Sequence, residues 1–420
     1  MNINFSSLRN HTIRNFNVYL LEKFIRGFGV IFILKFFSEI FSKTFLGYFL
    51  YYESILFILI SFSGLSINKI IIRLLNEKKY SSVRIIKTSF TLNLISTFIV
   101  IILSIVFIDF KDAVGIKFFI SFSFTLVSSL FIALESYYDS VKSPHVYIFP
   151  KLVIFIFIFI LKIYAIIEKK DIDLFLIFNA LEYLLLGSYY FYKLSIKKFN
   201  SIIFDKQIIR ELLKSAFPLL ITSSAVILSL KLDQLLIKGY LGIDSNAIYG
   251  SSIKIIDYLI ILPTLFLKTV YPNFIILNVN NKLNFNKTLN RSFYLLLFFS
   301  VISILIINVF SKNITLYIFN DQSGEISFYL KLLSPMILFY CIQNLYNNLI
   351  YTLKLEKKYM FRSLIGLILN LVLNIILIPY IGILGAVIST LFTLFFSSII
   401  FHLIDKQMRS YFKILIKFPF

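Results

Sequence analysis

Long apolar stretches follow one another along almost the whole chain, separated by short polar connections. A helix that spans the hydrocarbon core of a bilayer needs about 20 mainly apolar residues. An α-helix also satisfies its own backbone hydrogen bonds in lipid. The pattern therefore predicts an all-α integral membrane protein with twelve transmembrane helices. The expected spans are residues 18–40, 45–67, 85–108, 115–138, 146–167, 174–192, 212–236, 246–275, 290–311, 326–352, 361–379 and 382–404.

The longest connection lies near the midpoint of the chain, at residues 193–214, and is polar and basic. A short motif also repeats after the first span of each half: KTFLG at 43–47 and KGYLG at 238–242. We therefore expect two six-helix bundles around a central cavity, residues 1–200 and 201–420. Because each half holds an even number of spans, the two repeats share one orientation in the membrane.

The composition supports a membrane protein and excludes a soluble one. The chain is 59% hydrophobic, with mean hydropathy +0.87 and only 15% charged residues, which is far outside the range of soluble domains. Lys and Arg outnumber Asp and Glu by 42 to 21, and they gather in alternate connections. This alternation predicts that both termini are cytoplasmic. Since no soluble domain carries a basic face, we do not expect nucleic acid as a partner.

Several ionisable residues interrupt the predicted spans. Arg26 lies in the first span, Lys231 and Asp233 in the seventh, and Lys254 and Asp257 in the eighth. Ionised groups in a bilayer are costly, so they usually face a protein interior and often mark a transport path. These five residues are therefore candidates for substrate binding.

Structural explanations for the same charges stay open. Asp233 paired with Lys231 or Lys254 would be a buried ion pair that fixes helix packing. In the first span, Glu22 with Arg26 and Lys35 with Glu39 have the i,i+4 spacing of intrahelical pairs. Three further carboxylates are candidates for the cavity wall: Glu53, Glu135 and Glu182.

Amides are frequent in the tenth and eleventh spans. Gln343 and Asn347 share one helix face, as do Asn370 and Asn374. Amides donate and accept hydrogen bonds, which suits sugar hydroxyls, so Gln343 and Asn347 are candidates for substrate binding. The alternative is hydrogen bonding between helices, which we prefer for Asn370 and Asn374.

Nothing in the chain resembles a catalytic or metal-binding arrangement. There is one cysteine, Cys341, and the three histidines, His11, His145 and His402, are scattered. No metal-binding histidine motif and no glycine-rich phosphate loop are present. We therefore expect a protein that is not an enzyme and that carries no cofactor or metal.

The sequence resembles the polysaccharide-repeat flippases, the exporters of O-antigen and other lipid-linked oligosaccharides in the MATE-like superfamily, and the resemblance is strongest in its second half. The similarity rests on KLDQ at 231–234, the Leu-Gly pair at 241–242, Tyr249 followed by Lys254, and the prolines at 263 and 272. The stretch NLVLNIILIPYIGILGA at 370–386 resembles the family's penultimate hairpin. The glycine that usually precedes the tyrosine is missing, and the chain has no tryptophan.

The resemblance implies a flippase of undecaprenyl-pyrophosphate-linked oligosaccharide in the bacterial cytoplasmic (inner) membrane. Arg26, Lys231 and Lys254 would bind the diphosphate, and Asp233 and Asp257 would orient these cations or titrate with a coupling ion, a proton or sodium. Membrane lipids and the polysaccharide polymerase machinery are the expected partners. Two alternatives stay open: a multidrug or cation antiporter of the same superfamily, and a membrane-embedded glycan polymerase or ligase. Because the interior candidates are mainly cationic, we expect an anionic substrate.

Overall fold

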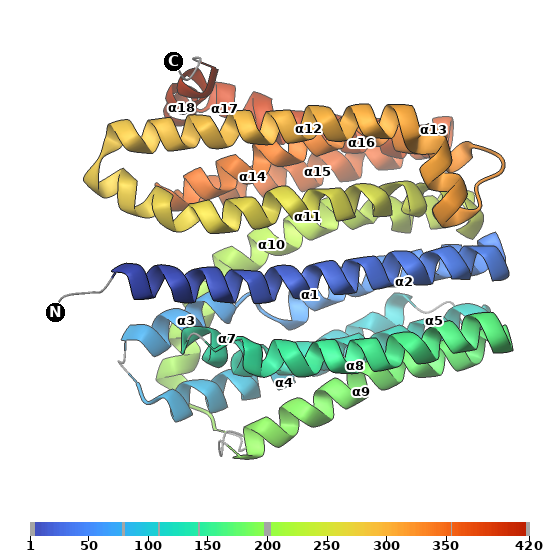
Figure 1. Ribbon diagram of the computed structural model, residues 1–420, viewed down its shortest axis with the longest axis horizontal. Coiled ribbons are helices and arrows are strands. Elements are labelled where there is room, and N and C mark those ends of the chain that lie inside the picture. The colour runs from blue at the N-terminus through green and yellow to red at the C-terminus, as the bar shows by residue number, and fades with distance from the viewer. Residues whose placement is uncertain are drawn as a thin grey trace. The chain divides into compact units, whose positions relative to one another are not determined.

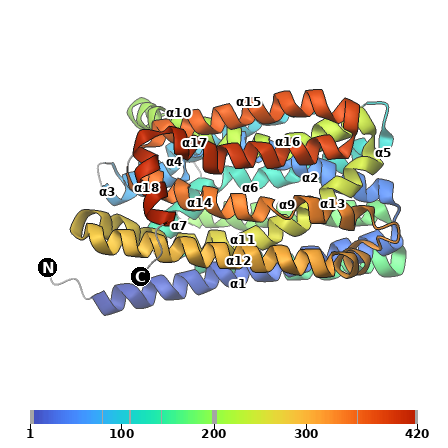
Figure 2. The same cartoon turned by 90° about the horizontal axis from the view of Figure 1, so that it is seen from above.

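The computed structural model describes residues 5–416, except 78–79, 108–109, 142, 197–202 and 354 (Figures 1 and 2). Every regular element in the described part is a helix. The chain divides into two compact units, Met1–Ser224 and Ala225–Phe420. The boundary falls inside one helix, α10 (Lys206–Leu241). Part of the predicted midpoint joint, residues 197–202, lies outside the described residues, and the division near residue 200 stays a prediction.

The described residues of the N-terminal unit form nine α-helices and the first part of α10, with short 3₁₀ and π turns between some of them. Three of these helices begin with an N-cap side chain: Ser42, Ser81 and Asp112 accept hydrogen bonds from backbone N–H groups in the first turns of α2, α4 and α5. The helices are α1 (Phe5–Ile40), α2 (Lys43–Ser63), α3 (Asn68–Glu77), α4 (Ser82–Ser104), α5 (Ala113–Ser123), α6 (Val127–Leu130), α7 (Ile132–Ser140), α8 (His145–Tyr164) and α9 (Ile172–Ile196).

The C-terminal unit contains the rest of α10 and eight further α-helices. Two glycines with positive φ, Gly242 (86°) and Gly382 (64°), form one-residue turns before α11 and α16. A Cβ at Gly385 would lie 2.5 Å from the carbonyl carbon of Leu377, so α15 and α16 approach closely. The helices are α11 (Ile243–Asn280), α12 (Lys282–Phe319), α13 (Glu325–Leu333), α14 (Met336–Thr352), α15 (Glu356–Ile381), α16 (Ile383–Phe395), α17 (Phe401–Ile404) and α18 (Lys406–Ile416).

Ten helical stretches of the described part are long and apolar enough to cross a membrane. Two further helices, α1 and α11, have 36 and 38 residues and are interrupted by charged side chains. At a rise of about 1.5 Å per residue, each is longer than the hydrocarbon core is thick. Together with the ten stretches they place helical structure at each of the twelve predicted spans, and the number of membrane crossings stays a prediction. The protein is thus an all-helical, multi-pass membrane protein.

Two of the predicted spans are interrupted: 326–352 is divided into α13 and α14, and 115–138 is divided further. The segment 115–138 is not one helix but is divided into α5, a 3₁₀ turn (Phe124–Leu126), α6 and α7. Serine and threonine side chains in this segment bond to nearby carbonyls, such as Ser128 to Thr125 at 2.7 Å, and favour such irregularities.

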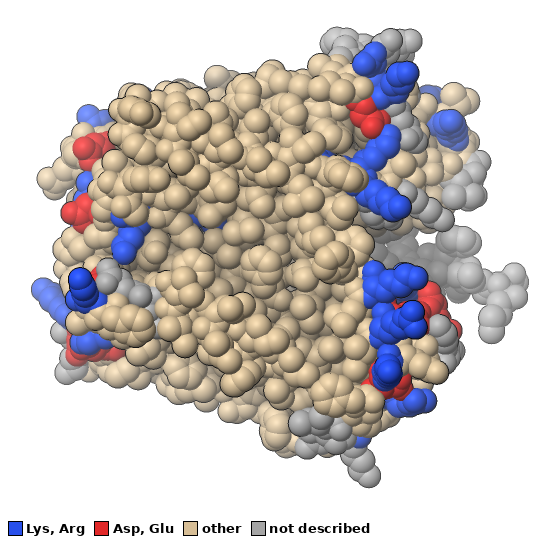
Figure 3. All heavy atoms as spheres, turned by 180° about the vertical axis from the view of Figure 1, so that it is seen from behind, with Lys and Arg blue, Asp and Glu red and all other residues tan. Residues whose placement is uncertain are grey.

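Within each unit, Lys and Arg gather near the helix ends and the middle of the visible face is uncharged (Figure 3).

Candidate functional site

The N-terminal unit encloses a cavity of about 450 Å³ between α1, α2, α8, α9 and the irregular segment after α5. Its wall is apolar over phenylalanines such as Phe49 and Phe155, yet it also carries charged side chains of both signs in equal number. These are Lys23, Arg26, Lys151 and Lys162, with Glu22, Glu53, Glu135 and Glu182.

The residues that line the cavity can be compared with the candidates predicted from the sequence. Arg26, a predicted substrate-binding residue, lines the cavity, and so do the candidate carboxylates Glu53, Glu135 and Glu182. The expectation of a mainly cationic interior is wrong for this cavity, because its charged side chains balance. Lys151, which was not among the candidates from the sequence, reaches the cavity from the second turn of α8.

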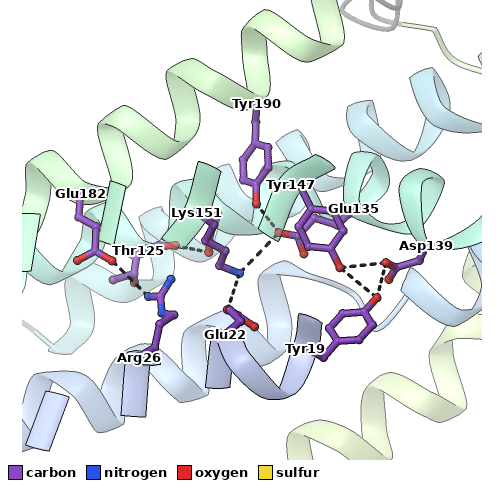
Figure 4. A network of polar contacts seen from close by, with 11 residues as sticks. Tyr19, Glu22, Arg26, Thr125, Glu135, Asp139, Tyr147, Lys151, Glu182 and Tyr190 are labelled. Atoms are coloured by element: carbon purple, nitrogen blue, oxygen red, sulfur yellow. Dashed lines mark hydrogen bonds and ion pairs between the residues drawn. The ribbon is translucent and has the colours of Figure 1, made fainter. Parts of the chain in front are cut away.

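Glu182 is shared by two cations. Its Oε1 lies 3.2 Å from Nη2 of Arg26, and its Oε2 lies 2.8 Å from Nζ of Lys162 (Figure 4). Glu182 and Lys162 are buried, with side chains 3% and 6% exposed, whereas Arg26 is 23% exposed. Arg26 therefore pairs across to α9 and not with Glu22 on its own helix, which was the alternative that the i,i+4 spacing had left open.

Neighbouring groups hold these charges in place. Lys162 also donates to Oδ1 of Asn179 at 3.0 Å, and Asn179 donates to Ser121 at 3.2 Å. The guanidinium of Arg26 lies over the ring of Phe155, 5.0 Å from its centroid. Its Nη1 has no hydrogen-bond partner among the described residues. Arg26 is thus oriented but keeps unused donor capacity.

A second charged group lies along the same wall (Figure 4). Nζ of Lys151 is 3.7 Å from a carboxylate oxygen of Glu22 and 3.8 Å from one of Glu135. Tyr190 donates to Glu135 at 2.6 Å. These ion pairs are longer than those of Glu182, and Lys151 is the more exposed lysine, at 25%. The network continues to Asp139, which accepts from Tyr19 at 2.6 Å and from Tyr147 at 2.9 Å.

In the C-terminal unit, Asp233 is held by neutral groups. Its carboxylate accepts hydrogen bonds from the hydroxyl of Tyr249 at 2.6 Å, from Nδ2 of Asn374 at 2.6 Å and from the hydroxyl of Thr390. The residue is 1% exposed. The alternative that Asp233 pairs with Lys231 or Lys254 is not what the structure shows. Asn374, by contrast, makes the interhelical hydrogen bond that we preferred for it.

The other charged candidates of the C-terminal unit lie on α10 and α11: Lys231, Lys254 and Asp257. Nζ of Lys231 lies 2.8 Å from Oδ2 of Asp257, which is 38% exposed. Lys254 is buried, and its ammonium lies 5.6 Å from the ring centroid of Tyr258. Lys231 and Asp257 thus form a contact between α10 and α11 that sequence spacing did not indicate.

The predicted sugar-binding amides contact protein groups. Nε2 of Gln343 donates to the hydroxyl of Ser397 at 3.1 Å, and Oδ1 of Asn347 accepts from Arg362. Arg362 is fully buried and also lies 3.2 Å from Nε2 of His402. Arg362 was not a candidate from the sequence, because it follows the basic residues at the start of α15, where an arginine near a membrane surface is ordinary. Asn347 therefore belongs to a packing cluster.

The residues of the described part form no group of three or more His, Cys, Asp or Glu side chains arranged to hold a metal ion. Arg26 lies in the N-terminal unit, and the other six candidates lie in the C-terminal unit. Of these six, Asp233 and Lys254 are buried, and the other four are partly exposed: Lys231, Asp257, Gln343 and Asn347.

No protein-family model matches the sequence, and no protein of curated function matches it. Solved structures do match its fold. The lipid II flippase MurJ, in an inward closed conformation, has a TM-score of 0.73 at 18% identity, covering 96% of this chain and 90% of that one. An inward-facing multidrug resistance MATE transporter of the MOP superfamily has a TM-score of 0.67 at 12% identity, covering 95% and 96%. A mutant of the Vibrio cholerae MATE transporter VcmN has a TM-score of 0.65 at 15% identity, covering 97% and 99%. The predicted MATE-like fold is confirmed.

Proposed function

We propose that this chain is a transporter that flips an undecaprenyl-pyrophosphate-linked oligosaccharide across the bacterial inner membrane. The observation that carries the proposal is the charged cavity inside an otherwise apolar helical bundle. Its volume of about 450 Å³ falls within the range of about 300–1,000 Å³ that is typical of ligand sites. Charged residues in a membrane are retained where they serve a polar substrate or ion.

The chemistry of the cavity wall suits a glycosyl diphosphate. Arg26 presents a planar guanidinium, which binds phosphate oxygens with paired N–H groups. Asn179 and the carboxylates on the wall suit the hydroxyls of sugars. The prenyl tail is apolar and can stay in lipid, so the protein needs to enclose only the head group. The similarity of the fold to that of a lipid II flippase also supports this substrate class.

The C-terminal unit supplies candidates for substrate and for ion coupling. Lys231 and Lys254 are the proposed cations for the diphosphate in this unit, with Asp257 orienting Lys231 through their 2.8 Å contact. Asp233 is the proposed carboxylate for the coupling ion, a proton or sodium, because its described partners are all neutral hydrogen-bond donors. Gln343 stays a candidate for sugar contacts, and Asn347 is the weaker one because it is bound to Arg362.

A multidrug or cation antiporter is the second candidate. The observation in its favour is the set of four carboxylates on the cavity wall, which would attract a cationic drug. Two of the similar structures are also described as MATE transporters. We prefer the flippase because the carboxylates Glu22, Glu135 and Glu182 already lie beside Lys or Arg.

The test is a transport assay with purified protein in liposomes, comparing a fluorescent undecaprenyl-pyrophosphate-linked sugar with a cationic dye. We expect flipping of the lipid and no accumulation of the dye. Arg26→Ala and Lys254→Ala should each abolish flipping without lowering the amount of protein in the membrane. The matched control is Lys35→Ala, which removes another cation of α1 that is paired with Glu39 at 3.9 Å. Transport of the dye alone would replace the proposal with the antiporter.

A further inference from the structure

The contact between Arg26 and Glu182 is suited to exchange. We propose that Glu182 is a built-in competitor for the anionic head group: Arg26 exchanges its bond to Glu182 for a phosphate oxygen of the substrate. Glu182 then lies beside the bound phosphate and limits how tightly it is held. This inference rests on the proposed function, because it assigns a role within the same cavity.

The first support is the way in which Glu182 divides its two oxygens. Oε2 is bound by buried Lys162 at 2.8 Å, and Oε1 faces the more exposed Arg26 at 3.2 Å. When Arg26 turns to a ligand, Glu182 keeps Lys162 as its counter-ion. Leaving one member of a buried ion pair without its partner is strongly destabilising, and this arrangement avoids that cost.

The second support is the unused capacity of Arg26. A guanidinium has five N–H donors. Arg26 bonds to Glu182 through Nη2 and has a side-chain hydrogen bond with Tyr183, but its Nη1 has no hydrogen-bond partner among the described residues. The ring of Phe155, 5.0 Å away, holds the guanidinium plane without using its donors. Arg26 can therefore meet a phosphate with two parallel N–H groups.

The third support is repulsion at short range. A phosphate bound to Arg26 lies within a few ångströms of Glu182, and like charges at that distance repel strongly where water is scarce. The head group is therefore held less tightly than Arg26 and Lys162 alone would hold it. Differences in affinity appear mainly in the rate of dissociation, so Glu182 favours release of the head group after transport.

The experiment measures binding of inorganic pyrophosphate to the purified full-length protein by calorimetry. We expect Glu182→Gln to bind at least about tenfold more tightly than the wild type, because a charge repulsion is removed. Arg26→Gln should abolish binding. The control is Glu39→Gln, which removes another ion-paired carboxylate, on α1, 3.9 Å from Lys35; its affinity should equal that of the wild type.

A second variant controls for misfolding, because Glu182→Gln leaves buried Lys162 without its carboxylate and could destabilise the protein. The double variant Glu182→Gln with Lys162→Gln removes one charge of each sign, so the net charge of the site is that of the wild type. It should still bind pyrophosphate more tightly, because Arg26 is released. In the liposome assay, Glu182→Gln should lower both KM and the maximal rate.

Two outcomes distinguish the inference from the proposed function. If all four proteins that keep Arg26 bind pyrophosphate with equal affinity, Glu182 is only a packing partner, and the inference is overturned while the proposed function stands. If none of these proteins binds pyrophosphate and the lipid-linked sugar is not flipped, the proposed function fails and the inference fails with it.

Discussion

The ammonium of Lys231 lies 2.8 Å from a carboxylate oxygen of Asp257, which joins α10 to α11. The two residues are 26 positions apart, and Asp257 is 38% exposed. Partly exposed ion pairs contribute little to stability, at most about 1 kcal/mol. The proposed role of Asp257, to orient Lys231, is compatible with this small contribution to stability.

This relationship gives a prediction that separates orientation from stability. Asp257→Asn should lower the melting temperature only slightly, whereas it should reduce the transport rate, because Lys231 loses the group that orients it. Exchange of the two residues, Lys231→Asp with Asp257→Lys, should leave protein abundance at the level of the wild type but should not restore full transport. A loss of melting temperature as large as that of a core substitution would show that the pair is structural.

Asp233 should behave differently, because it is buried and held by neutral donors. Asp233→Ala leaves the hydroxyl of Tyr249 and the amide of Asn374 without their acceptor, and we expect a cost of about 1–3 kcal/mol. Asp233→Asn keeps the shape and should cost less. If Asp233 binds the coupling ion, both variants should lose transport that depends on a proton or sodium gradient, as measured in liposomes. Normal gradient-driven transport by Asp233→Asn would contradict this role.

Arg362 is predicted to be a stability residue. It is fully buried and bonds to Asn347 on α14 and to His402 on α17. His402 in turn stacks on Tyr346, with ring centroids 3.7 Å apart. Arg362→Lys keeps the charge but loses the planar fork, so we expect a loss of about 1–3 kcal/mol. Thermal unfolding of the purified protein measures this, with exposed Lys357→Ala as the control on the same helix; equal melting temperatures for the two variants would contradict it.

The topology is tested by labelling single cysteines in intact cells after Cys341 is replaced by Ser. Lys206 and Lys357 are exposed and lie on the predicted cytoplasmic side, so a membrane-impermeant thiol reagent should not label a cysteine placed at either position. Lys111 and Lys312 are also exposed and lie on the opposite side, so a cysteine at either position should be labelled. Labelling of Lys206→Cys from outside would contradict the predicted orientation of the central connection.

The helices could be predicted because length and hydropathy determine them. The spans at 146–167 and 290–311, for example, lie inside α8 and α12 apart from a few residues at one end of α8. The position of the break in 115–138 could not be predicted. Serine and threonine lower the mean hydropathy of a segment only slightly, so the segment still reads as one span, but their hydroxyls can bond to backbone carbonyls and interrupt the helix.

Single charged residues were found more readily than their partners. Arg26, Lys254 and Asp233 were indicated by their cost in lipid, and all three are buried or line a cavity. Their partners depend on which helices are neighbours, which sequence spacing does not show. Glu22 is four residues from Arg26, yet Arg26 pairs with Glu182, which is 156 residues away. Lys162 was overlooked because it lies near the end of an apolar span, where a lysine is ordinary.

The turn between α15 and α16 has a consequence for how the protein is made. Gly382 alone separates two strongly apolar helices, and Gly385 brings the start of α16 against the backbone at Leu377. One residue cannot carry α16 away from the end of α15, so neither helix can reach its final position alone. We expect the two to leave the insertion machinery together as a preformed hairpin. Gly385→Leu should therefore yield chains that stall during biogenesis and are degraded, before any question of transport arises.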